Sequence, residues 1–263
     1  MVQRPGPDPG FPYLDENRRY QFPPAPAAQN GIVAVGGNLS PGMLLSAYEQ
    51  GIFPWYNPED PVIWQSPDPR CVIFPHTLHI SRSMEKILKR RDFEIALDRD
   101  FPAMISACSG IPRPGQAGTW ITQDIVEGYT ALHRLGWAHS AECRREGRLA
   151  GGCYGIRLGK VFFGESMCSL VPNASKAALL TLARIMFDDG LAFIDCQVPT
   201  EHLLSLGAVV VSRGDYLRLL GENLSEHFPR GKADGGTGPI GDSSRESDRA
   251  GRRGNWGALY DMR

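Results

Sequence analysis

The sequence predicts a mixed α/β (α+β) protein, with a small N-terminal α/β domain followed by a larger domain built on a mixed sheet. Three consecutive strand-like segments, 138–144, 149–158 and 161–169, are joined by short turns and are expected to pair as an antiparallel meander. A helix-like segment over 173–188 then leads to a strand over 192–198. Because a helical crossover returns the chain in the same direction, the strands on either side of it are expected to be parallel.

Residues 1–30 are rich in Pro, Asn and Gln, a composition typical of a segment that runs irregularly over the surface. Its candidate anchors are three aromatic side chains, Phe11, Tyr13 and Phe22. The apolar run over 31–37 predicts a short buried strand. This strand begins the small N-terminal domain, which is expected to cover residues 31–70.

One helix is expected inside this small domain. Ser40 is a favourable N-cap, the proline after it suits a first helical turn, and Gly51 ends the apolar periodicity. A loop carrying Trp55 and Trp64 follows. It leads to the stretch SPDPR at 66–70, where we place the domain boundary.

The larger domain is expected to cover residues 71–224, and helical spacing and polar N-caps define most of its elements. Before the meander these are a helix after Ser81, a strand over 93–98, a short helix from Asp100 to near Gly110 and a longer one from Thr122 to Gly136. After the crossover they are a short helix from Thr200 and a strand over 209–213 that closes the sheet. Residues 225–263 have too few apolar side chains to fold alone and are predicted to form a disordered, low-complexity tail.

Composition narrows the class of protein. The net charge of −1 over 263 residues argues against a surface coated with positive charge for nonspecific nucleic-acid binding. No apolar run is long enough to span a bilayer, and the N-terminus lacks a signal-peptide core, so a cytoplasmic location is expected. The cysteines lack the spacing of a zinc site and are interpreted as reduced core thiols: Cys71, Cys108, Cys143, Cys153, Cys168 and Cys196.

Polar residues interrupt the two strands that are expected to be parallel, and open α/β sheets bind ligands beyond the carboxyl ends of such strands. Period-two alternation groups the side chains into two sets, Phe163, Glu165 and Met167 on the first strand and Phe193, Asp195 and Gln197 on the second. Carboxylates among apolar side chains are costly to bury and recur at active sites. The alternative is that they only tie a strand to a helix.

Eight blocks of the sequence resemble the leucyl/phenylalanyl-tRNA–protein transferases in their residues and in their order along the chain. They are GIVAVGGNLSPGMLLSAYEQGIFPWY (31–56), SPDPR (66–70), TWIT (119–122), LHRLGWAHSAE (132–142), GGCYG (151–155), FFGESM (162–167), NASKAAL (173–179) and IDCQV followed by HL and SLGA (194–208). One block could arise by chance, whereas eight in order are highly specific. The resemblance implies a GNAT-like acyltransferase domain after the small N-terminal domain.

The resemblance also implies the reaction. The donors are leucyl-, phenylalanyl- or, more weakly, methionyl-tRNA, and the acceptors are proteins that begin with Lys or Arg. The transferred amino acid marks these proteins for N-end-rule degradation. An aminoacyl ester is already activated, so no Ser or Cys nucleophile, cofactor or metal is expected. The reaction needs positioning and the removal of a proton from the acceptor α-amine.

By resemblance, Asp195 and Gln197 form the catalytic pair at the acceptor amine, with Asp195 orienting or polarising Gln197, and Glu165 contacts the reacting amino or ribose groups. Three alternatives stay open. Asp195 is either the base or only an orienting group. Alternatively, the terminal ribose hydroxyl of the tRNA carries out the proton transfer. Glu165 could instead read the charge of the basic acceptor residue.

The donor is expected to stack its terminal adenosine on Trp55 and Trp120, for which plain packing is the alternative. Its apolar side chain is expected to enter a substrate pocket built from Phe162, Ser166, Met167, Cys153 and Ile194. Three positions depart from the usual family pattern, namely Gln65, Cys153 and Cys168. Because cysteine in place of a larger residue reshapes a pocket, the preference among Leu, Phe and Met stays open.

A basic stripe on the helix after Ser81 is the candidate tRNA-binding surface, formed by Arg82, Lys86, Lys89 and Arg90. Such a stripe could follow phosphates and make binding sensitive to salt. The alternative is a solvated helix face.

Two rival functions remain. An acetyltransferase that uses acyl-CoA needs a glycine-rich cradle for the pyrophosphate, but the connection SLVPNASK (169–176) has no glycine. A module that binds aminoacyl-tRNA or basic N-termini without transfer is expected to lack part of the set Asp195, Gln197 and Glu165. All three are present, which favours catalysis.

Overall fold

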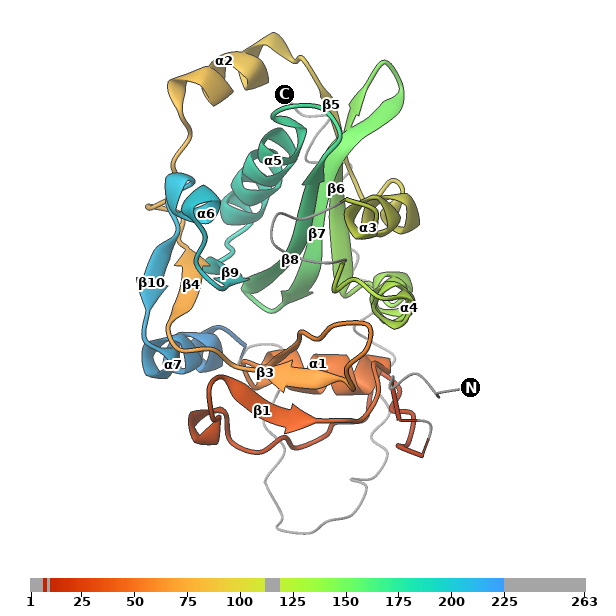
Figure 1. Cartoon of the computed structure of the whole chain (residues 1–263). Coiled ribbons are helices and arrows are strands. Elements are labelled where there is room, and N and C mark those ends of the chain that lie inside the picture. Colours follow the sequence, from red (N-terminus) through yellow and green to blue (C-terminus); the bar gives the residue numbers. More distant parts are fainter. Residues whose placement is uncertain (1–6, 9, 112–118, 225–263) are drawn as a thin grey trace.

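The computed structural model describes residues 7, 8, 10–111 and 119–224 (Figure 1). The predicted tail over 225–263 lies outside the described residues. The helices are α1 (Pro41–Glu49), α2 (Arg82–Arg90), α3 (Phe101–Ser109), α4 (Gln123–Arg134), α5 (Ala174–Asp188), α6 (Glu201–Ser205) and α7 (Arg213–Leu224), with a 3-10 turn at Ala25–Ala27. The strands are β1 (Ile32–Val35), β2 (Phe53–Pro54), β3 (Ile63–Gln65), β4 (Arg70–Ile73), β5 (Glu94–Leu97), β6 (Ala138–Arg145), β7 (Arg148–Leu158), β8 (Val161–Ser169), β9 (Phe193–Gln197) and β10 (Val209–Val211).

The larger sheet has the strand order β10-β4-β9-β8-β7-β6-β5. β6, β7 and β8 form an antiparallel meander, and α5 carries the chain across to β9, which pairs parallel with β8. Both predictions are therefore confirmed. The sequence does not predict β4, because its first residue belongs to the stretch that we assigned to the domain boundary. β4 lies between β9 and β10 and pairs antiparallel with both.

Helices cover both faces of this sheet, so it divides two apolar cores. The core on one face contains side chains of α2 and α5, with α6 packed against it, and α5 runs across the sheet in Figure 1. The core on the other face contains side chains of α1, α3, α4 and α7. No helix in the described part of the chain is long and apolar enough to cross a membrane.

A small three-stranded sheet, in the order β1-β3-β2, lies below the larger one in Figure 1. α1 joins the two parts, because Tyr48 lies in the same core as Tyr129 of α4 and their hydroxyl groups are hydrogen-bonded. Gly51 lets α7 approach the end of α1: its φ is +76°, and a Cβ there would lie 2.5 Å from Leu217. A boundary at residue 70 thus divides the sequence but not the core on this face.

Several local predictions are wrong. β1 is not buried, because it lies at the edge of the small sheet with Ile32 41% and Val35 61% exposed. Tyr13 is 67% exposed and is no anchor, whereas Phe22 is buried. The expected loop after Gly51 contains β2 and β3, and α7 is not predicted at all. The other predicted helices and strands between 81 and 213 are present.

Candidate active site

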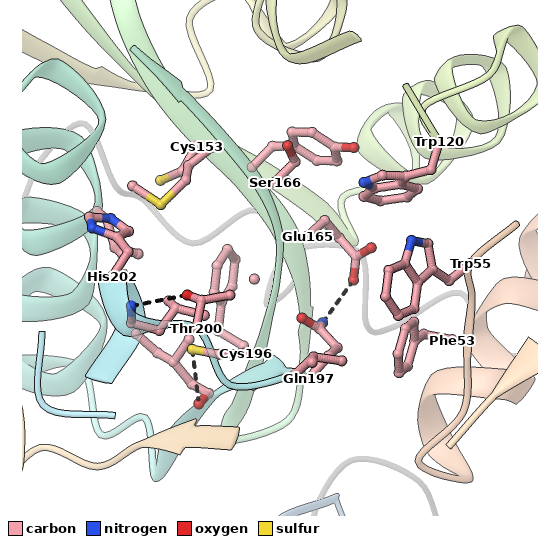
Figure 2. A pocket seen from close by; sticks show the side chains of 18 of the residues that line it. Phe53, Trp55, Trp120, Cys153, Glu165, Ser166, Cys196, Gln197, Thr200 and His202 are labelled. Atoms are coloured by element: carbon pink, nitrogen blue, oxygen red, sulfur yellow. Dashed lines mark hydrogen bonds between the residues drawn. The ribbon is translucent and has the colours of Figure 1, made fainter. Parts of the chain in front are cut away.

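A pocket of about 450 Å³ opens where β8 and β9 separate, beside the small N-terminal sheet (Figure 2). The two strands pair only where residues 161–163 of β8 lie beside residues 193–195 of β9, although both strands continue further. The pocket lies beyond this pairing, at the carboxyl ends of two parallel strands, as the topology predicts.

Irregularities in both strands shape this opening. Along β8, Gly164 pairs with Gly155 and Ser166 with Tyr154, which leaves Glu165 as an extra residue. Such a bulge reverses the alternation of side chains beyond it. The prediction that Phe163 and Met167 share a face is therefore wrong: Phe163 lies in the core with α1, whereas Met167 packs against the core with α5. Cys196 is the extra residue in the same way on β9.

The pocket has an apolar floor and an aromatic side. The floor contains the predicted substrate-binding residues Phe162, Met167, Cys153 and Ile194, together with Leu179 and Leu203, and Ser166 also lines the pocket. Trp55 and Trp120 lie near Glu165 on the opposite side (Figure 2). Of the two unusual cysteines only Cys153 lines the pocket, because Cys168 belongs to the core on the other face of the sheet.

Glu165 lies on the pocket wall between an amide and a pair of tyrosines. Its Oε1 accepts a hydrogen bond from Gln197 Nε2 at 3.3 Å, and its Oε2 accepts one from the Tyr129 hydroxyl at 2.9 Å. Tyr48 stands behind Tyr129. Burial of the carboxyl group raises the pKa of Glu165 to about 7, against the opposing effect of the tyrosine hydrogen bonds. This acid therefore titrates close to neutral pH.

Asp195 is completely buried and does not line the pocket. Its Oδ1 accepts hydrogen bonds from Arg70 Nε and from the backbone N–H of Gln197, both at 2.9 Å. Its Oδ2 accepts them from Arg70 Nη2 at 2.6 Å and from the Tyr216 hydroxyl at 2.8 Å. Of the predicted catalytic residues, Gln197 and Glu165 face the pocket and Asp195 supports Gln197 from behind.

Sequence reasoning misses several residues of the site. Tyr48 and Tyr129 are apolar-face positions of predicted helices, so their hydroxyl groups give no signal. Arg70 ends the SPDPR block, and its presence in a shared motif is the only sign of its role. Cys196, interpreted as core, is both buried and part of the pocket lining.

The predicted basic stripe lies on α2, at the end of the larger sheet away from the small N-terminal sheet (Figure 1). Arg82, Lys86, Lys89 and Arg90 are all exposed. Arg90 forms an ion pair with Asp92 at 2.9 Å, whereas the other three make no ion pair with a described residue. The structure thus brings the catalytic and pocket residues together and leaves the stripe as a separate surface.

The antiparallel meander, the helical crossover and the parallel strand that diverges around a pocket make this a mixed α/β domain with its candidate site at the carboxyl ends of two parallel strands. Among solved structures, a GCN5-related N-acetyltransferase-like protein from Streptococcus suis 89/1591 is similar with a TM-score of 0.34 and 14% identity. That similarity covers 56% of this chain and 58% of the other.

The family is shown by sequence comparison. The model described as leucyl/phenylalanyl-tRNA protein transferase matches residues 72–221, and the model of that family's N-terminal domain matches residues 37–68. A leucyl/phenylalanyl-tRNA–protein transferase of Myxococcus xanthus is 49% identical over 83% of this chain and 93% of its own length. The one of Syntrophus aciditrophicus is 50% identical over 80% of this chain and 88% of its own. The chain belongs to the leucyl/phenylalanyl-tRNA–protein transferase family, a family of aminoacyltransferases.

Proposed function

We propose that this protein transfers Leu, Phe or Met from aminoacyl-tRNA to the N-terminal Lys or Arg of acceptor proteins. Transfer marks these proteins for N-end-rule degradation in the cytoplasm. One observation carries the proposal: the pocket joins an apolar floor to a rim where Glu165 and Gln197 meet beside two tryptophans. The floor suits an apolar amino acid, the tryptophans suit a base, and the rim suits an amine.

The reaction is a direct aminolysis. The α-amine nitrogen of the acceptor attacks the ester carbonyl carbon, a C–N bond forms, and the bond from that carbon to the ribose oxygen breaks. The amine loses one proton and the departing ribose oxygen gains one. We propose that Glu165 accepts the proton from the amine, because its carboxyl faces the pocket and its pKa is raised to about 7 by burial. The tyrosine pair and Gln197 then hold the carboxyl in place.

Asp195 has a different role in this proposal. All four hydrogen bonds to its oxygens come from groups behind the pocket wall or from the backbone, so the amine of a substrate finds no open side of the carboxylate. We therefore assign Asp195 as the group that orients Gln197, and not as the base. The Gln197 amide is then available to contact the amine or the ester.

Acyl-CoA is disfavoured as the donor. In CoA-dependent acyltransferases the pyrophosphate needs open backbone N–H groups at a helix N-terminus. Here the N–H of Ala174 donates to Val171 O, and the N–H of Ser175 donates to Ser169 Oγ. These first-turn donors of α5 are therefore occupied by the chain itself.

The proposed function is tested by incubating the protein with radiolabelled leucyl-, phenylalanyl- and methionyl-tRNA and an acceptor protein that begins with Arg. Label is expected to move to the acceptor N-terminus, and a matched acceptor that begins with Gly is expected to stay unlabelled. Binding of the aminoacyl-tRNA without transfer would contradict the enzyme and support the binding module. Equal labelling of both acceptors would contradict the acceptor specificity.

Donor preference is expected to depend on Cys153, which pairs with Met167 across β7 and β8 on the pocket floor. Replacing Cys153 with Met fills space below the donor side chain. We expect kcat/KM for phenylalanyl-tRNA to fall by about tenfold or more relative to leucyl-tRNA, since the change adds two carbon atoms and even one methylene in an apolar pocket has effects of this order. Cys143→Ala, a buried change outside the pocket, is the control and should keep the donor ratio.

The tRNA surface is tested by removing together the three positive charges of α2 that form no ion pair with a described residue, as Arg82→Ala, Lys86→Ala and Lys89→Ala. If they contact phosphates, aminoacyl-tRNA binding weakens and its logarithmic dependence on salt becomes shallower by about two units. The control removes three exposed arginines elsewhere, Arg18, Arg134 and Arg218. An equal change in salt dependence for both variants would show only a nonspecific effect of net charge.

A further inference from the structure

A buried guanidinium lies directly behind the pocket wall. Arg70, the first residue of β4, is completely buried and binds both carboxylate oxygens of Asp195. Its Nη2 also donates to the Tyr216 hydroxyl at 3.2 Å, and its Nη1 donates to the carbonyl of Gly51 at 3.2 Å. The guanidinium carbon lies 4.3 Å from the centre of the Tyr216 ring and 4.9 Å from that of Phe53. The cation is therefore hydrogen-bonded to three groups and lies close to two aromatic rings.

Such an ion pair is a poor means of stabilising a fold. The desolvation of two buried charges offsets most of their attraction, and apolar residues of similar volume commonly stabilise a core as well or better. Neither Arg70 nor Asp195 lines the pocket. Their value must then lie in what the pair holds in place.

The pair holds Gln197 in an unusual backbone conformation. Gln197 ends β9 with φ at +57°, in the left-handed region that residues with a side chain rarely adopt. The hydrogen bond from its N–H to Asp195 Oδ1 fixes this turn, and the turn directs the side chain to the Glu165 carboxyl. Asp195 is in turn fixed by Arg70 and by Tyr216 from α7.

The same guanidinium reaches the donor side of the site. The Gly51 carbonyl and the Phe53 ring stand at the start of β2, and the residues that follow, Pro54 and Trp55, line the pocket. One cation thus contacts both the support of Gln197 and the strand that carries a tryptophan of the donor site. The Tyr216 hydroxyl is hydrogen-bonded to the carboxylate and to the guanidinium. The Tyr216 ring packs against Phe193 and lies close to Gly51.

We propose that Arg70 and Tyr216 are positioning residues of the transfer reaction. They hold Asp195 so that Gln197 faces the acceptor amine, and Arg70 additionally sets β2 relative to Gln197. This inference rests on the proposed function. It assigns separate effects to the two residues: the Tyr216 hydroxyl acts on the chemical step alone, whereas Arg70 acts on the chemical step and on donor binding.

Two conservative variants separate these effects. Tyr216→Phe removes one hydrogen bond to Asp195 and keeps the ring, so kcat is expected to fall on the order of tenfold, with unchanged affinity for a phenylalanyl-adenosine amide analogue that cannot be cleaved. Arg70→Lys keeps the charge but loses the forked contact and the reach to Gly51. It is expected to lower kcat on the order of a hundredfold and also to weaken the analogue.

The control is Leu220→Val, which shortens a buried side chain of α7 and leaves all four hydrogen bonds to Asp195 in place. It is expected to lower the Tm as much as Tyr216→Phe does while keeping kcat. The proposal is overturned if Tyr216→Phe keeps the wild-type kcat, or if Leu220→Val loses kcat to the same extent. Absence of transfer by the wild-type protein would instead overturn the proposed function, so the two failures are distinct.

Discussion

Replacement of Glu165 by Gln is expected to lower the rate of transfer by about 10²–10⁴-fold, the usual contribution of a positioned base. The change keeps the size of the side chain, and its oxygen can still accept the hydrogen bond from Tyr129. It removes the ability to accept a proton and also the hydrogen bond from Gln197, because the new NH2 group faces Gln197 Nε2. In the wild-type protein kcat should rise as the pH passes through about 7, because burial raises the pKa of Glu165 to that value and the ionised form is the base. The variant should lack this rise.

The raised pKa of Glu165 also predicts that the stability of the protein falls over the pH range in which kcat rises. Its pKa is raised by burial from an ordinary value of 4.5 to about 7, so its favourable contribution to folding is complete at pH below 4.5 and is lost as the pH rises through 7. Glu165→Gln has no such loss. The Tm of the variant relative to wild type should therefore increase between about pH 4 and pH 8.

Glu127→Gln, at an exposed position on the neighbouring helix α4, is the control and should change neither profile. A Glu165→Gln variant that keeps the rise in kcat near pH 7 would exclude Glu165 as the base. That result would leave the terminal ribose hydroxyl of the tRNA as the acceptor of the proton.

Replacement of Asp195 by Ala is expected to destabilise the protein by about 3–5 kcal/mol, as measured by urea unfolding, and to abolish transfer. The reason is that Arg70 is left as an unpaired charge in a fully buried position. Loss of activity in this variant alone therefore does not identify a base.

A double variant separates folding from transfer. Arg70→Met with Asp195→Leu replaces the ion pair by apolar side chains of similar size and should recover most of the lost free energy of unfolding. It should not recover transfer, because the N–H of Gln197 loses its acceptor. Recovery of transfer would contradict the orienting role of Asp195, and equal instability of the single and double variants would contradict the account of the unpaired charge.

The order of helices and strands follows from local patterns, and these predict most of the larger sheet. N-caps such as Ser81 and Thr122 accept hydrogen bonds from the first helical turn in the structure, as expected. In the larger domain, the elements that the sequence does not predict are β4 and α7. Only four residues form β4, and the first of them, Arg70, belongs to the stretch assigned to the boundary, which leaves an apolar run too short for local propensity to decide.

The candidate site is predictable in location but not in its connections. Strand alternation and the crossover bring Glu165, Asp195 and Gln197 to one end of the sheet. The bulge at Glu165 reverses the alternation, and neither it nor the left-handed turn at Gln197 has a local sequence signal. Contacts such as that between Arg70 and Asp195 join residues that are far apart in the chain, and one sequence alone does not reveal them.

The floor of the pocket has a consequence for how such enzymes diverge. Cys153, Phe162 and Ile194 belong to the core beneath α5 and also line the pocket. Evolutionary change in amino-acid preference is then limited by the stability of the fold, because each substitution that reshapes the pocket also changes the packing of the core. Lineages that change their donor are expected to do so through paired, volume-compensating replacements, with positions such as Cys153 and Met167 changing together.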